Sequence, residues 1–408
     1  MLNVAVINGG RGAATLIPAL LSYDAIQLTS IVNAYDDGKS TGEIRRFFGM
    51  LGPSDLRKVQ ALMLGASDPD FAANQQLFRY RYPIDCDRGA VLLEMLEFAD
   101  GTRAELAGAT ITSPHVRAAL RVFVREFVEG LTIIEKLVPD RLSFADCAVM
   151  NCIYAGAFLH FRRNIERATI CISRLFQLRG TVLPNSIEAK TLVALREDGE
   201  MLYCEADIVE LRSNVRIERI YLLDTLLDRV RFDPLSTADK RQFLERHHCF
   251  VEATPLVRQA LAQADVIIYS SGTQHSSLYP TYLTDGLAQA IADNRNAQKV
   301  FVTNIGADYE TPSYRASDYV LGAHRYLNLA DARDYAMTEL FDYVLINTGR
   351  RKGDETYVEF DRANFAKIPL ELVLGDFESA EAPGRHDGNK LVDIILERCR
   401  QANPGFAR

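Results

Sequence analysis

Short apolar runs that end in glycine-rich or acidic turns set the pattern of the N-terminal part of the chain. Residues 2–7 (LNVAVI) form a β-branched run that ends in the turn 8–12, and residues 13–21 have helical composition. A second apolar run, residues 26–32, leads into Asp36 and Asp37. This order predicts a β-α-β unit with parallel strands and a right-handed crossover. Because ligands collect at the carboxyl ends of such strands, both loops are predicted to lie at a binding edge.

The parallel pattern resumes near the C-terminus after a long interruption. Helical periodicity dominates residues 56–137 and returns over 147–178, while residues 191–195 and 201–209 are predicted strands around the turn 197–199. Further buried-type strands and a closing helix are predicted at residues 264–269, 299–304, 341–347 and 391–399.

These elements predict an α/β fold with a Rossmann-like parallel-sheet core, an inserted helical region and a small antiparallel β element. We expect one interrupted domain. Its expected segments are the first part of the core (1–55), the helical region (56–178), the small β element and connection (179–260), and the second part of the core (261–408).

Composition narrows the possible partners. The chain has 408 residues, 48% hydrophobic and 25% charged, which is typical of a globular protein, and its formal net charge of -8 disfavours binding to a nucleic-acid backbone. No apolar stretch reaches about 18 residues, and no basic leader precedes the first strand, so we expect no membrane association and a cytoplasmic location. The seven cysteines form no CxxC pair and are expected to be reduced thiols. A small-molecule ligand is therefore expected.

The segment Asp36-Asp37-Gly38-Lys39-Ser40-Thr41 carries the densest set of candidate ligand groups. Two carboxylates at the end of a strand can hold a hard divalent cation, and Lys39, Ser40 and Thr41 can meet an anion. The Gly-Lys-Ser-Thr ending looks like a Walker A motif, but that motif requires a glycine at position 33, where the chain has Asn. A solvated, turn-forming segment is the alternative interpretation.

Two other loops offer similar chemistry. Gly9, Gly10 and Gly12 would let a phosphate approach backbone amides, and Arg11 could add a charge-assisted contact. The turn lacks the full GxGxxG spacing, so a dinucleotide fingerprint is not supported, and such turns also use glycine for purely geometric reasons. The loop 270–277 presents several hydroxyl groups, although a helix-capping cluster has the same composition.

Asp55 precedes Arg57 and Lys58 at a predicted helix start. A capped helix N-terminus explains this arrangement as well as a catalytic role does.

Taken in order, these motifs resemble those of the CofD/YvcK family, which includes 2-phospho-L-lactate transferases and YvcK-type gluconeogenesis factors. The resemblance spans nearly the whole chain. It rests on the glycine turn 9–12, the loop 36–42, the stretch 52–58, Asn151, the RGTVLP sequence at 179–184, the loop 270–286, Asn304, Glu310-Thr311, 316–318 and 385–391.

The resemblance implies a core that binds a nucleotide diphosphate-linked small molecule with Mg²⁺ or another divalent cation. It implies either a transferase of phosphorus-containing groups, 2-phospho-L-lactate transferase-like, or a non-catalytic UDP-sugar-binding regulatory factor, and it suggests a homodimer. Asp36, Asp37 and Asp55 would be catalytic, with Asp36 and Asp37 at the metal. The substrate would meet Gly9, Gly10, Arg11, Gly12, Lys39, Ser40, Thr41, Arg57, Asn151, Ser271, Gly272, Thr273, Ser277 and Asn304. Arg11 and Lys39 depart from the family pattern, where Thr and Gly are usual.

Overall fold

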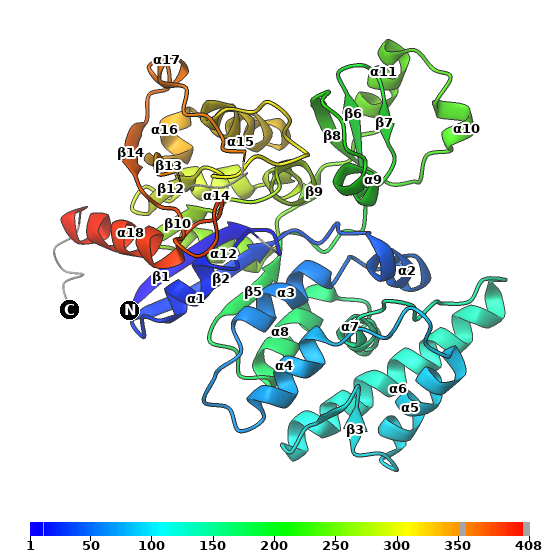
Figure 1. Cartoon of the computed structure of the whole chain (residues 1–408). Helices are drawn as coiled ribbons and strands as arrows, with labels where there is room; N and C mark the ends of the chain where they lie inside the picture. The colour runs from blue at the N-terminus through cyan, green and yellow to red at the C-terminus, as the bar shows by residue number, and fades with distance from the viewer. Residues whose placement is uncertain (11, 351–355, 403–408) are drawn as a thin grey trace.

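A parallel sheet of seven strands forms the centre of the fold (Figure 1). The computed structural model describes residues 1–10, 12–350 and 356–402. The strand order is β14-β13-β12-β10-β1-β2-β5, and every neighbouring pair is parallel. The strands are β1 (Leu2–Asn8), β2 (Ile26–Val32), β5 (Thr181–Pro184), β10 (Val266–Tyr269), β12 (Gln298–Val302), β13 (Tyr343–Asn347) and β14 (Glu371–Gly375). The predicted fold class is confirmed.

Apolar side chains on both faces explain why these short runs form the central sheet. In β1, Val6 and Ile7 are fully buried, and Val6 is in register with Ser30 of β2 and Ile268 of β10. Strands buried on both faces are typical of parallel sheets that helices cover. The strand order reverses between β1 and β10, which is the point where ligands bind in open α/β sheets.

The strand β5 belongs to this sheet, although its residues fall in the segment that the sequence assigns to the small β element. It pairs with β2 through Ser30↔Val182 and Ile31↔Leu183. Val182 and Leu183 are buried, and a short edge strand of this kind carries little periodicity by which to assign it.

Helices of the core lie around the sheet. The chain ends in α18, which packs against α1 beside the N-terminus (Figure 1). These helices are α1 (Leu16–Leu21), α12 (Pro255–Ala262), α13 (Tyr279–Tyr282), α14 (Leu287–Asp293), α15 (Ala316–Ala330), α16 (Met337–Leu340), α17 (Arg362–Phe365), α18 (Gly388–Ala402) and the π-helix η1 (Gln274–Leu278).

The segment between β2 and β5 is mostly helical. It begins with α2 (Lys39–Phe48) and α3 (Ser54–Leu62), and Figure 1 shows α5 and α6 farthest from the sheet. Its other elements are α4 (Phe71–Arg79), α5 (Arg88–Asp100), β3 (Glu105–Leu106), β4 (Ala109–Thr110), α6 (Pro114–Leu137), α7 (Val149–His160) and α8 (Ile165–Leu175). No helix within the described ranges is both long enough and apolar enough to cross a bilayer.

The small antiparallel element stands apart from the main sheet (Figure 1) and has an apolar cluster of its own around Val193, Leu195 and Tyr221. Its strands run β7-β6-β8. It contains β6 (Thr191–Arg196), β7 (Met201–Leu202), β8 (Ile217–Leu223), α10 (Arg229–Phe232) and α11 (Thr237–His247), and the short pair β9 (Val251–Glu252) and β11 (Thr284–Asp285) joins the connection to the core.

The predicted strand over 201–209 is wrong beyond residue 202. Residues Glu205–Glu210 form a helix, α9, with the acidic residues Glu205 and Asp207 in its first turn. Acidic groups stabilise a helix N-terminus, and Glu205 and Ile208 are buried on one face at helical spacing.

Candidate functional site

A cavity of about 980 Å³ lies where the loops after β1, β2, β10 and β12 meet at the carboxyl edge of the sheet. The core contributes Gly9, Gly10, Gly12, Asp36, Gly38, Ser271, Gly272, Thr273, Ser277, Asn304, Asp308, Arg385 and His386, among others. The helical region contributes Thr41, Asp55, Arg57, Lys58, Leu62, Phe78, Arg79, Arg81 and Asp146, and α9 contributes Glu205. Its volume suits a ligand the size of a nucleotide conjugate.

The glycine turn after β1 is packed too closely for any larger residue at two positions. A Cβ atom on Gly12 would lie 2.0 Å from the carbonyl oxygen of Ser271, and one on Gly10 would lie 2.3 Å from Oδ1 of Asp55. The turn therefore brings the loops after β1 and β10 and the start of α3 into contact. Arg11, the predicted phosphate contact, lies outside the described residues.

The segment after β2 forms the N-terminus of α2. Gly38 is the N-cap residue, and its amide donates to Oδ1 of Asp36 at 3.0 Å. Lys39 is the first residue of the helix, and Thr41 lines the cavity. Ser40 is buried and accepts from Nη2 of Arg81 at 3.5 Å. The N-terminus of α2 carries the partial positive charge that favours an oxyanion.

Asp36 and Asp37 are adjacent in sequence but lie in different surroundings. Asp36 lines the cavity, whereas Asp37 is not among the lining residues. Oδ1 of Asp37 accepts from the Ala206 amide at 3.0 Å, and its Oδ2 lies 3.8 Å from Arg45. Asp37 therefore anchors α9 to this loop.

Three carboxylates and one lysine meet in the middle of the cavity. Nζ of Lys58 lies 2.7 Å from Oδ1 of Asp55 and 3.9 Å from Oδ2 of Asp36. Burial, and then the Asp55 carboxylate, raise the pKa of Asp36. Burial, followed by the charges of Asp36, Asp37 and Asp55, raises the pKa of Glu205 to about 9. A cation bound among these carboxylates would lower their pKa values and favour their charged forms.

A divalent cation would need oxygen ligands besides those of the protein. Within the described part of the chain, no group of three or more His, Cys, Asp or Glu side chains is placed to hold a metal ion. Mg²⁺ is commonly bound by one or two carboxylates together with phosphate oxygens and water. Asp36 fits that role through its place in the cavity wall, and Asp55 is its nearest carboxylate neighbour there.

The loop after β10 is held by its own side chains and by its neighbours. The amide of Gly272 donates to Oδ1 of Asn304, and Nδ2 of Asn304 donates back to the Gly272 carbonyl, both at 3.0 Å. Oγ1 of Thr273 donates to Oγ of Ser277 at 2.8 Å. Asn304 thus fixes the shape of the loop and also lines the cavity.

His386 faces the same loop from the C-terminal part of the chain. Its Nδ1 lies 3.2 Å from Oγ of Ser271. Burial lowers the pKa of His386 to about 4, so the imidazole is neutral near pH 7.

Asn151 is fully buried in α7 and does not line the cavity. Its Nδ2 lies 3.5 Å from Oγ1 of Thr41, so Asn151 contacts the first turn of α2 without lining the cavity itself. The structure therefore brings it to the site as a supporting residue.

Sequence reasoning missed several groups in the cavity wall. Glu205 follows no motif and reaches the site through the antiparallel element, while Arg79, Arg81 and Asp146 come from the helical region. Arg385 and His386 belong to a stretch that matched the family pattern, and that match was the one signal for them.

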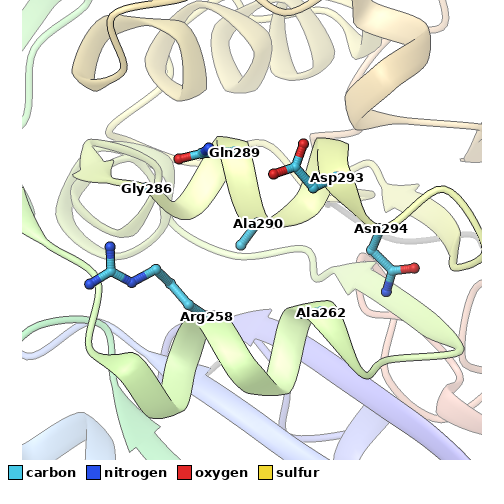
Figure 2. A pocket seen from close by; sticks show the side chains of 7 residues that line it. All are labelled: Arg258, Ala262, Gly286, Gln289, Ala290, Asp293 and Asn294. Carbon is cyan, nitrogen blue, oxygen red and sulfur yellow. The ribbon is translucent and has the colours of Figure 1, made fainter.

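A second hollow, of about 260 Å³, lies between α12 and α14 (Figure 2). Arg258 and Asp293 are its charged residues, and no loop that follows a strand of the central sheet contributes to it. It therefore lacks the convergent polar groups that mark the larger cavity.

The fold and site define an α/β protein with a large polar cavity at the switch point of its sheet. A family model described as "2-phospho-L-lactate transferase CofD" matches residues 4–378. The chain belongs to the CofD family, which confirms the expected resemblance.

Curated relatives align over almost the full length. A putative gluconeogenesis factor of Thermotoga maritima is 25% identical over 97% of this chain and 98% of its own length. A gluconeogenesis factor of Listeria innocua is 26% identical over 98% and 96%. A Bacillus halodurans protein of the upf0052 family shares the fold, with a TM-score of 0.65, 19% identity and coverage of 97% of this chain and 100% of that one.

Proposed function

We propose that the cavity binds a nucleotide diphosphate-linked small molecule together with a divalent cation, and that the protein transfers a phosphorus-containing group from it. The observation that carries this proposal is the meeting of the Gly9–Gly12 turn, the N-terminus of α2 and the buried carboxylate of Asp36 in one cavity. Amides and helix N-termini bind phosphate oxygens, and a carboxylate beside them can share a cation with those oxygens.

Different residues of the cavity would bind the diphosphate, hold the cation and face the reacting group. The first turn of α2 and the loop 271–277 would hold the diphosphate, with Asn304 keeping that loop in shape. Mg²⁺, when bound at Asp36, would offset the phosphate charge and assist the leaving nucleotide phosphate. Asp55, which pairs with Lys58, would face the reacting group.

In the proposed transfer, an acceptor hydroxyl gives its proton to a cavity carboxylate and its oxygen attacks the distal phosphorus. The bond from that phosphorus to the bridging oxygen breaks, and a nucleoside monophosphate leaves. Asp36 and Asp55 are the proposed proton acceptors, because both line the cavity and Asp37 is held by Ala206 and Arg45.

The relatives are named gluconeogenesis factors, which favours a second candidate, a regulatory factor. In that case the cavity would bind a UDP-sugar without turnover, as the family resemblance implies. Mass spectrometry of the ligand that co-purifies with the protein, followed by incubation with Mg²⁺ and candidate acceptors, separates the two. Release of a nucleoside monophosphate supports the transferase. A bound nucleotide diphosphate conjugate that stays intact over long incubation supports the regulatory factor. Failure of every such conjugate to bind would overturn both.

A further inference from the structure

We propose that Glu310 is a positioning residue of the cavity, which in its protonated form orients the hydroxyl groups of the loop after β10 as donors towards the ligand. Glu310 lies between β12 and α15 and is not among the residues that line the cavity. This inference rests on the proposed function, because the hydroxyl groups concerned belong to the loop 271–277 that would hold the diphosphate.

The carboxyl group of Glu310 is buried against η1. The residue is 3% exposed. Its Oε2 accepts from the amide of Ser276 at 2.9 Å, and its Oε1 lies 2.5 Å from Oγ of the same serine. The amide of Glu310 donates to Oδ1 of Asp308 at 2.8 Å, which fixes the loop after β12. Glu310 therefore contacts the cavity wall through Ser276, which lines the cavity.

A chain of hydroxyl groups continues from Ser276 along the cavity wall. Its Oγ lies 3.0 Å from Oγ1 of Thr273, and Oγ1 of Thr273 lies 2.8 Å from Oγ of Ser277. All three residues line the cavity. A Cβ atom on Gly9 would lie 2.6 Å from Cβ of Ser277, so the chain ends beside the glycine turn after β1. The buried carboxyl group is thus connected to the place where two proposed phosphate-binding loops meet.

The protonation state of Glu310 decides the direction in which these groups donate, because each hydroxyl group has one proton to give. A charged carboxylate takes the proton of Ser276, and Thr273 then receives none from it. A protonated carboxyl group donates to Ser276, which donates to Thr273, which donates to Ser277. Donors that point the same way strengthen one another, and no negative charge then lies behind the proton that Ser277 offers to a phosphate oxygen.

Glu310 is mostly protonated at pH 7, because burial, and then the charge of Asp308, raise its pKa to about 8. Two further titratable neighbours keep their charge state between pH 7 and pH 9. Burial lowers the pKa of His275 in η1 to about 3, and burial raises the pKa of Tyr319 in α15, whose hydroxyl group contacts Thr311. Ionisation of Glu310 above pH 8 would therefore add a negative charge behind the loop.

A purely structural role would also place a carboxyl group against the Ser276 amide. Such a role predicts no link between the proton on Glu310 and the affinity for the ligand. Glutamine separates the two roles, because its side chain can accept from the Ser276 amide and donate to Oγ of Ser276 but cannot ionise in this pH range. Glu310→Gln is therefore a permanent copy of the protonated acid.

Calorimetry of the full chain with Mg²⁺ at pH 7 and pH 9 tests this role, with UDP-glucose and GDP-mannose as probes. Relative to Glu310→Gln, we expect the wild type to lose about tenfold in affinity between the two pH values, because its protonated fraction falls from about nine-tenths to about one-tenth. Glu245→Gln, the same change at an exposed position in α11, should keep the pH dependence of the wild type. Glu205 also has a raised pKa, but its titration is common to these proteins and cancels in the comparison.

Thr273→Val tests the hydroxyl chain separately, because it keeps Glu310 and removes the middle donor. We expect it to reduce the pH dependence to about threefold or less. Circular dichroism checks the fold of each variant. If Glu310→Gln does not fold, the comparison of the wild type with Thr273→Val carries the test.

The outcomes separate the role of Glu310 from the proposed function. Equal pH dependence in the wild type and Glu310→Gln, or loss of probe binding by the folded glutamine variant at pH 7, overturns the role of Glu310 while the nucleotide site stands. An unchanged pH dependence in Thr273→Val overturns the hydroxyl chain. Failure of both probes to bind the wild type at pH 7 overturns the proposed function, and the role of Glu310 with it.

Discussion

The amide of Asp37 lies 3.4 Å from Oε2 of Glu205, 168 residues later in the chain. The neighbouring amide of Ala206 donates back to Oδ1 of Asp37 at 3.0 Å. This exchange joins the loop before α2 to α9, and it makes the antiparallel element part of the cavity wall. The antiparallel element is therefore joined to the cavity by the contacts of Asp37 with Glu205 and Ala206.

The Asp37–Glu205 contact can be measured by comparing two variants that remove the same carboxyl group. Glu205→Gln keeps an oxygen acceptor for the Asp37 amide, and Glu205→Ala does not. We expect the alanine variant to be less stable than the glutamine variant by about 1–2 kcal/mol in urea unfolding, because a buried donor loses its partner. Equal stability of the two variants would show that the contact contributes nothing.

Replacing Asp36 by Asn should separate ligand binding from folding. The amide can still accept from Gly38, and removing a buried charge beside Asp55 relieves repulsion. We expect the free energy of unfolding without ligand to stay the same or rise by up to about 1 kcal/mol, while Mg²⁺-dependent turnover or ligand binding is lost. Thermal unfolding with and without Mg²⁺ and nucleotide measures both effects.

Asp24→Asn is the matched control for Asp36, because Asp24 is exposed and far from the cavity lining. Full Mg²⁺-dependent activity in Asp36→Asn would remove Asp36 from the proposed metal site.

Gly12 and Gly65 offer a direct test of the close contact between two loops. A methyl group on Gly12 would meet the backbone of Ser271 and Gly272, whereas one on Gly65 would meet nothing within 4 Å. We expect Gly12→Ala to cost about 1–3 kcal/mol or more and to weaken ligand binding, because the clash is with backbone that cannot rotate away. Gly65→Ala should change stability by about 0.5 kcal/mol or less. Similar urea midpoints for the two variants would contradict the packing of the loops.

The buried His386 predicts a contribution to stability that is lost in acid. Its pKa in the folded protein is about 4, below the ordinary value near 6.5, so the unfolded chain binds the proton more readily. The contribution of the neutral imidazole is therefore fully present above about pH 6.5 and is lost as the pH falls towards 4, by at most about 1.4 kcal/mol per pH unit.

His386→Asn should remove this dependence. The stability difference between wild type and variant, measured by urea unfolding at pH 7.5 and pH 5, should shift in favour of the variant at the lower pH. Replacing the exposed His115 by Asn controls for losing an imidazole at the surface. A difference that does not change between the two pH values would mean that His386 titrates alike in both states.

Several elements could be predicted because their signals are local. The apolar runs before Gly9 and Asp36 each end in turn residues, as β1 and β2 do. Both predicted bounds of β2, Ile26 and Val32, agree with the structure. Neither edge strand, β5 nor β14, was predicted, because these short runs take their place in the sheet by pairing with other strands. The strand expected after Tyr203 failed because α9 is stabilised by contacts with Asp37 that no local pattern contains.

By itself, the sequence determined the α/β class and the loops that line the cavity, because strand periodicity and glycine turns are properties of neighbouring residues. The resemblance of its ordered motifs indicated the family. Only the tertiary structure decided which of the two adjacent aspartates, Asp36 and Asp37, faces the cavity. It also decided that Glu205, Arg79 and Arg81 line the cavity together with Asp36. The physical reason is that burial and charge pairing depend on what lies within a few ångströms. Asp37 and Glu205, for example, are 168 residues apart in the chain.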